Sequence, residues 1–245
     1  MEVHHHPNVE KKNFKEYFLE GLMIFLAVTM GFFAENIREH IVNKERESQY
    51  MRSFVEDLSN DLIELPILIK SIQRQQLDAA DSLPILLKNI NLNNPANKVY
   101  FYFRGIIRQQ PITAFITDRS IVQIRNAGEM RLISNKQIAD SLIDYYKQID
   151  FIGVLQGFLG NFKGELGKIY LPLLDSYGFD KVSDSLDKLV IPREPIYLRS
   201  TDPIALNNSL LYVSHIRGLS KAIEIRVIVL KNKAANIRKL ITDKY

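Results

Sequence analysis

An uncharged apolar stretch near the N-terminus constrains this chain more than any other feature. Residues 21–34 carry no charge, and Thr29 is the only strongly polar side chain among them. Residues 17–19 extend the stretch to 18 positions, with Glu20 as the only charge. Eighteen residues of α-helix span about 27 Å, which is close to the hydrocarbon thickness of a thin bilayer. The sequence therefore predicts a transmembrane helix over residues 17–36.

The energetics of insertion favour the same interpretation. The stretch holds nine Leu, Ile, Phe or Val side chains, which contribute roughly −4 kcal/mol together on an insertion scale. Glu20 lies one turn inside the end, so its side chain can reach the interface at a lower cost than a central acid. The residues expected within the membrane are Tyr17, Phe18, Leu19, Glu20, Gly21, Leu22, Ile24, Phe25, Leu26, Val28, Phe32 and Phe33.

Two alternatives to a membrane span remain, a buried core helix and a cleavable signal peptide. Lysines 11, 12 and 15 fit a signal peptide, but residues 32–35 lack the small-x-small pattern before a cleavage site. With an uncleaved anchor, a short tail rich in Lys is expected to stay inside the cell. We therefore expect a single-pass protein of the inner membrane, with the lipid bilayer as a partner. Residues 1–16 would form a cytoplasmic tail, and the C-terminal domain would lie in the periplasm.

The charge balance argues against a nucleic-acid partner. The chain has 32 basic and 28 acidic residues, which are interspersed, and a net charge of +4. A nucleic-acid surface needs a dense basic patch with aromatic side chains between the charges. The basic residues that gather at positions 231–244 are better explained as the solvated face of a helix. The absence of cysteine excludes a disulfide scaffold and a thiolate metal site.

After the anchor, the sequence predicts helices throughout residues 37–245. Apolar residues recur at alternating steps of four and three, which is the spacing of a heptad seam. Pro66 lies within this seam and is expected to kink the helix or start a new one, because proline lacks an N–H donor. The stalk helix is placed at residues 37–90, and copies of the chain are expected to associate through its seam. The seam consists of Met51, Val55, Leu58, Leu62, Leu65, Ile69 and Ile72.

Similar seams place central helices at residues 99–175 and a C-terminal helix at residues 205–242. Residues 99–107 could form either a strand or a buried helix. Residues 176–203 are expected to form a loop, because they contain three prolines. The predicted fold class is all-α, with the transmembrane helix continuing into an elongated antiparallel helical bundle.

Capping residues predict where the central helices begin. Thr117 or Asp118 is the expected N-cap of a helix that includes Gly128 and continues to Ile133. Ser134 is the expected cap of the next helix, with Gln137 at the capping-box position.

Five glycines follow the heptad rhythm in the second of these central helices. On a helix they would form one bare stripe, and each costs about 1 kcal/mol relative to alanine. Close approach of a neighbouring helix would compensate this cost, and a groove for a ligand, lipid or partner helix is the alternative. The stripe consists of Gly153, Gly157, Gly160, Gly164 and Gly167.

Residues with catalytic or metal-binding potential are few. His4, His5 and His6 could bind a transition metal, but in a tail such a run is usually an adventitious site. Asp57 and Asp61 could ligate metal in a bundle core, yet their positions beside the seam favour a solvated face. No recognised catalytic motif is present. We assign no catalytic residue, metal or cofactor, and expect that the chain is not an enzyme.

Two stretches together resemble a known family. The first is FKEYFLEGLMIFLAVTMGFFAENIREH, and the second is SIVQIRNAGEMRLISNKQIADSLIDYYKQID. The combination resembles a family of uncharacterised bacterial membrane-anchored proteins defined by a domain of unknown function, over roughly residues 1–150. The resemblance implies one N-terminal span, a helical domain and no established activity. The structural interpretation of its signature is a helix–helix corner followed by packed tyrosines. The signature positions are Gly128, Arg131, Leu132, Asn135, Tyr145 and Tyr146.

Three functional hypotheses follow from the sequence. The first is a membrane-anchored helical module for interaction, sensing or assembly, which forms a homo-oligomer or binds an envelope protein. The second is a metal protein or enzyme that uses carboxylates of a helical bundle. The third is a soluble helical scaffold in which residues 18–34 are buried.

Overall fold

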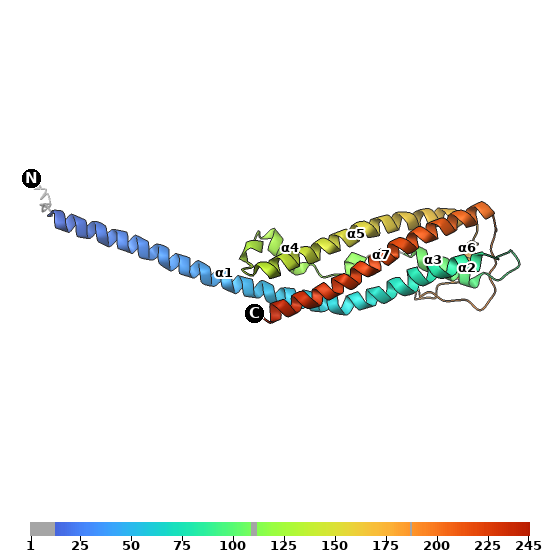
Figure 1. Ribbon diagram of the computed structural model, residues 1–245, viewed down its shortest axis with the longest axis horizontal. Helices are drawn as coiled ribbons and strands as arrows, with labels where there is room; N and C mark the ends of the chain where they lie inside the picture. The colour runs from blue at the N-terminus through green and yellow to red at the C-terminus, as the bar shows by residue number, and fades with distance from the viewer. Residues whose placement is uncertain (1–12, 109–111, 187) are drawn as a thin grey trace, which may run out of the picture. The chain divides into compact units, whose positions relative to one another are not determined.

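The computed structural model confirms the all-α fold class (Figure 1). It describes residues 13–108, 112–186 and 188–245. Within these ranges no strand forms, and the only extended pairing is an isolated antiparallel bridge between Ser183 and Leu189. The chain divides into two compact units, residues 1–49 and residues 50–245, and each is described by itself.

The first helix, α1 (Phe14–Ile72), begins in the first unit and continues into the second. Its start is capped, because the backbone N–H of Asn13 donates to Glu16 Oε2 at 2.9 Å. A Glu that reaches back to the cap in this way satisfies one of the N–H groups that a helix leaves without a partner. The helix therefore starts just before the apolar stretch.

Pro66 does not end this helix. α1 includes Pro66 and ends only at Ile72. Leu65 and Leu68 are both buried on either side of the proline, and their packing offsets the lost hydrogen bond. The interruption comes later, as a π-helix η1 (Gln73–Leu77) followed by α2 (Asp78–Leu87). The predicted stalk helix is thus continuous to Leu87, with one π-helical turn in it and no break at its proline.

Residues 99–107 form a helix. α3 (Asn97–Ile107) buries Val99, Tyr100, Phe103 and Ile106. Gly105 lies where α3 approaches the π-helix: a Cβ atom there would stand 3.3 Å from the carbonyl oxygen of Gln75. The glycine is explained by this close approach of two backbones.

The corner after α3 differs from the prediction. After the 3-10 turn η2 (Ile112–Phe115) comes α4 (Arg119–Asn126), which ends before Gly128 instead of continuing to Ile133. Gly128 has a φ of 67°, a left-handed conformation that glycine adopts without strain and that ends a helix. A second 3-10 turn, η3 (Met130–Leu132), leads to α5 (Lys136–Tyr170). Asn135 caps α5 in place of Ser134, and its side chain accepts from Gln137 N at 3.0 Å.

The predicted loop at residues 176–203 is not entirely irregular, because it contains the short helix α6 (Ser176–Asp180). The last helix, α7 (Pro203–Thr242), is capped by Asp202, whose side chain accepts from Ala205 N at 2.9 Å. α5 and α7 pack side by side, while α2 and η1 contact α7 and α3 (Figure 1).

The heptad seam of α1 is part of the core of the second unit. Met51, Leu58 and Leu65 are fully buried, and Val55, Leu62 and Ile69 pack against the core. The most N-terminal residue of this core is Tyr50. The expectation that copies associate through the seam therefore loses its motivation, since these side chains are already covered within the chain.

Candidate functional site

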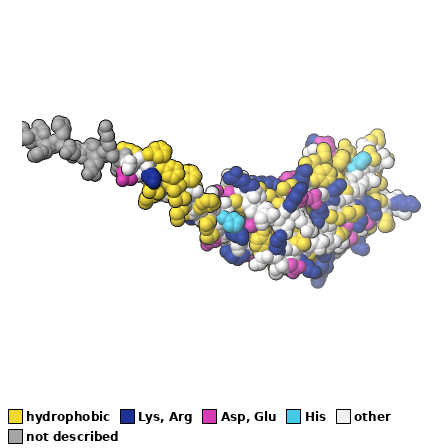
Figure 2. Space-filling model, turned by 60° about the vertical axis from the view of Figure 1, so that its left-hand side comes forward, with side chains coloured by type: hydrophobic (Ala, Val, Ile, Leu, Met, Phe, Trp, Pro, Cys, Tyr) yellow, Lys and Arg dark blue, Asp and Glu magenta, His cyan; other side chains and the backbone are white. Residues whose placement is uncertain are grey.

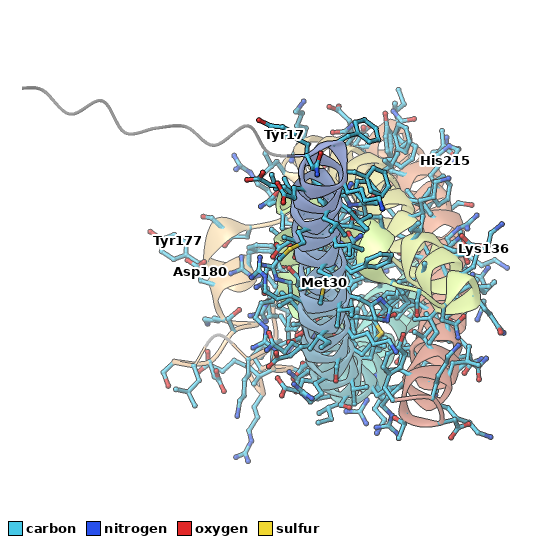
Figure 3. The ribbon with its side chains drawn as sticks, turned by 90° about the vertical axis from the view of Figure 1, so that its left-hand side faces the viewer. Tyr17, Met30, Lys136, Tyr177, Asp180 and His215 are labelled. Carbon is cyan, nitrogen blue, oxygen red and sulfur yellow. The ribbon has the colours of Figure 1, made fainter. Side chains whose placement is uncertain are left out.

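A continuous run of exposed apolar side chains lies on the N-terminal part of α1. Figure 2 shows hydrophobic side chains almost without interruption along this segment. Figure 3 labels Tyr17 and Met30 on it, and their side chains are 58% and 69% exposed. The helix is long and apolar enough to cross a membrane, and none of its most apolar window is buried. All ten large apolar residues predicted to span, together with Glu20 and Gly21, are exposed.

The polar groups of this segment suit a span. The hydroxyl of Thr29 donates to the carbonyl oxygen of Phe25 at 2.7 Å. This hydrogen bond satisfies the hydroxyl group within the helix itself, which an apolar surrounding requires. At the C-terminal end, Arg38 Nε donates to Glu35 Oε2 at 2.8 Å. The uncharged stretch therefore ends at an ion pair.

We expected Asp57 and Asp61 to lie on a solvated face, but both are fully buried. Asp57 Oδ2 accepts from the backbone N–H of Ser120 at 2.8 Å, and its Oδ1 accepts from Arg119 Nη2 at 3.0 Å. Asp61 Oδ1 accepts from the backbone N–H of Thr117 at 2.7 Å. The two carboxylates of α1 therefore hold the first turn of α4 and the residues before it.

Tyr145 and Tyr146, two of the residues on which the resemblance rests, lie beside these carboxylates. The hydroxyl of Tyr145 donates to Asp61 Oδ2 at 2.6 Å, and that of Tyr146 donates to the carbonyl oxygen of Thr117 at 3.3 Å. The two rings stand edge to face, with centroids 5.2 Å apart. Burial raises the pKa of Asp61, and the hydrogen bonds from Tyr145 and Thr117 oppose that rise. Burial and the neighbouring carboxylate likewise raise the pKa of Tyr145.

The other signature positions shape the corner between α4 and α5. Gly128 provides the left-handed residue, and Asn135 provides the cap of α5. Arg131 and Leu132 lie in the 3-10 turn between them. The corner is attached to α1, because the hydroxyl of Tyr50 donates to Glu129 Oε2 at 2.5 Å. These positions thus belong to one region of the fold, in which α1, the corner and α5 are joined by hydrogen bonds.

The glycine stripe does not have the close helix packing that we favoured. A Cβ atom added at Gly157, Gly160, Gly164 or Gly167 would meet no atom within 4 Å. At Gly153 it would meet only the methyl group of Thr113, at 3.7 Å. The reason is that α5 buries a different face, formed by Ile152, Leu159, Leu166 and their neighbours. Within the chain the stripe faces open space.

The π-helix carries a polar cluster that the sequence did not predict. Gln76 is buried, and its Oε1 accepts from the hydroxyl of Ser220 at 2.8 Å. Gln73 Nε2 donates to Oε1 of the buried Glu224 at 2.5 Å, and Lys221 Nζ donates to Glu224 Oε2 at 2.6 Å. π-Helices of this kind occur frequently at functional sites. Here the π-helical turn directs Gln73 and Gln76 toward α7.

Nothing in the described residues forms a metal centre. No group of three His, Asp or Glu side chains lies close enough to hold an ion there. Asp57 and Asp61 are occupied by hydrogen bonds from Arg119, Ser120, Thr117 and Tyr145. His215 is exposed and stacks on Phe162, with ring centroids 5.3 Å apart. Residues 4–6 lie outside the described residues.

Comparison of the chain with protein-family models, with curated proteins and with solved structures gives no match.

Proposed function

We propose that this protein is a membrane-anchored helical module that acts through noncovalent contacts, in interaction, sensing or assembly. The observation that carries the proposal is the exposed apolar helix at residues 17–34, in a chain whose core starts only at Tyr50. An uncovered apolar surface of this length is unfavourable in water and favourable in a bilayer. The resemblance to a bacterial membrane-anchored family supports the anchor and the helical domain, and it implies no specific activity.

The proposed topology places the N-terminus in the cytoplasm and the helical domain in the periplasm. The lysines of the N-terminal tail support this orientation, since positively charged flanks stay inside. Burial of the heptad seam leaves the choice between a homo-oligomer and another envelope protein to experiment.

The test combines membrane extraction with a topology reporter in a bacterial host. A reporter that is active only outside the cytoplasm is fused after Tyr245, and the membranes are washed with alkaline carbonate. We expect the protein to stay in the membrane with an active reporter. Release by carbonate would contradict the anchor, whereas retention with an inactive reporter would reverse only the orientation.

A matched pair of variants separates membrane insertion from nonspecific adsorption to the membrane. Phe25 and Phe158 are both exposed phenylalanines on helices, 64% and 55% respectively, but only Phe25 lies in the proposed span. An arginine near the centre of a span costs about 2.5–3.5 kcal/mol, which cancels most of the favourable insertion energy. Phe25→Arg should therefore release a large fraction of the protein, and Phe158→Arg should release none.

A further inference from the structure

A cleft of about 410 Å³ lies beside the π-helix, within residues 50–245. Its volume falls within the range of small-molecule sites. Three cationic side chains line it, and each comes from a different segment: Arg74 from η1, Arg108 after α3, and Lys188 from the turn before Leu189. None of the described residues that line the cleft is acidic. The described lining residues therefore carry only positive charge, which favours an anionic ligand.

Aromatic and aliphatic side chains form the rest of the wall. Phe101 and Tyr102 line the cleft from α3, with ring centroids 5.3 Å apart in an edge-to-face arrangement. Leu189 also lines the cleft. Exposed apolar contact area of this kind suits the ring of a ligand, while the cations suit a charged substituent. A simple inorganic anion would use only half of such a lining.

The backbone around the cleft is held in place by buried contacts. Lys163 is buried on α5, and its ammonium group donates to the carbonyl oxygen of Arg108 at 2.8 Å. The Gln75 carbonyl oxygen stands against Gly105, so the π-helix reaches the cleft wall directly. In the π-helix, Gln73 and Gln76 bond to α7 while Arg74 and Gln75 line the cleft. The π-helical turn thus positions Arg74, and Gln73 and Gln76 attach the turn to α7.

Leu186 and Lys188 are both held by hydrogen bonds to Asp184. Asp184 Oδ1 accepts from the backbone N–H groups of Leu186 at 2.9 Å and Lys188 at 2.8 Å. The backbone N–H of Val190 donates to the carbonyl oxygen of Val182 at 2.9 Å. These bonds position the backbone at Lys188, whose side chain is exposed.

We propose that this cleft binds a small organic anion, a carboxylate or phosphate attached to a planar ring. Arg74 and Lys188 hold the anionic group, and Phe101, Tyr102 and Leu189 contact the ring. The site lies within the second unit and goes beyond the proposed function, because binding does not require the membrane anchor.

The proposal is tested by calorimetric titration of the full chain in phosphatidylcholine nanodiscs, with empty discs subtracted. The probes are 2-naphthoate and 1-naphthyl phosphate, which carry the two anionic groups on one ring system. We expect saturable binding of at least one of them at one equivalent per chain, and the tighter one identifies the anionic group. Absence of saturable binding of both probes overturns the proposal.

Variants locate the binding. Arg74→Gln and Lys188→Gln should each weaken binding about tenfold, because each removes a charge-assisted hydrogen bond. Lys98→Gln is the matched control, since Lys98 is exposed on α3 but does not line this cleft. Equal affinity of the wild type and both cleft variants overturns the assignment. Circular dichroism of each variant confirms that the helices are intact.

Two further probes test the composition of the ligand. Neutral 2-naphthalenemethanol and inorganic phosphate each lack one half of the proposed ligand, and both should bind at least tenfold more weakly than the ring-bearing anion. Phosphate that binds as tightly as naphthyl phosphate would overturn the role of the aromatic wall. Naphthalenemethanol that binds as tightly as naphthoate would overturn the role of the cations.

Discussion

Burial decides what a single charged residue does in this protein. Asp57 and Asp61 looked like solvated carboxylates because they alternate with the seam that begins at Met51. They belong instead to a second stripe, at steps of four and three, that starts at Tyr50 and Phe54 and is buried throughout. That second stripe is a signal in the sequence, since 50, 54, 57 and 61 share one face of a helix. Their partners Thr117 and Tyr145 lie 56 and 84 residues away along the chain, and periodicity says nothing about such pairs.

Lys163 gives a prediction at the scale of one residue. Burial lowers its pKa to about 8 from an ordinary value of 10.5. Between these two pH values the unfolded chain binds more protons at this group than the folded chain does, so stability must rise with pH. Relative to Lys163→Met, the free energy of unfolding of the wild type should rise by about 2 to 3 kcal/mol from pH 7 to pH 10. Urea denaturation at both pH values measures it.

The comparison with Lys163→Met cancels the titration of all other groups that the two proteins share. An identical pH dependence of the two proteins would show that Lys163 is solvated in the folded state. A fall in relative stability with rising pH would show that its charge is stabilised there, contrary to the burial of its side chain.

At the scale of elements, heptad spacing predicted where helices lie better than it predicted where they end. The seams correspond to α1, α5 and α7, because a helix that buries one face must repeat its apolar residues at that period. Gly128 was placed inside a helix because glycine is compatible with either a helix interior or its end. No pattern in the sequence predicted the π-helix, because its polar residues Gln73 and Gln76 are recognisable as buried only once α7 lies against them.

The glycine stripe gives a prediction at this scale. Alanine at Gly160 or Gly164 meets no atom of the chain, and it favours a helix over glycine by about 0.5–1 kcal/mol. Both substitutions should therefore raise the free energy of unfolding by that amount in urea denaturation. Gly128→Ala should lower it by about 1 kcal/mol, because of the left-handed φ of 67°.

The same variants report on an external partner of the stripe. If a helix of another molecule approaches the stripe closely, Gly164→Ala will stabilise the fold and yet weaken assembly, which sedimentation of the full chain in detergent detects. A loss of stability on Gly160→Ala and Gly164→Ala would instead mean that the stripe is covered within the chain.

At the scale of the whole molecule, the sequence correctly indicated an all-α chain and a candidate span, because both depend on local composition and period. It did not indicate which surfaces close on one another. The seam beginning at Met51 and an intermolecular coiled coil have the same pattern, and only the packing of α1 within the second unit distinguishes them. The cleft beside η1 has no local pattern either, since Arg74, Arg108 and Lys188 come from three separate segments.

The division of the chain predicts that residues 50–245 fold without the N-terminal segment. The buried hydrophobic core of the described residues starts at Tyr50, so removal of residues 1–49 deletes none of it. This fragment should be soluble without detergent, unfold cooperatively and show the circular dichroism of an all-α protein, whereas the full chain should need detergent or lipid. The fragment should also sediment as a monomer if the seam is covered as the structure shows. A fragment that aggregates or unfolds without cooperativity would mean that the first unit contributes to the core. A cooperative dimer that Leu58→Ala dissociates without unfolding would return the seam to the role of an intermolecular interface.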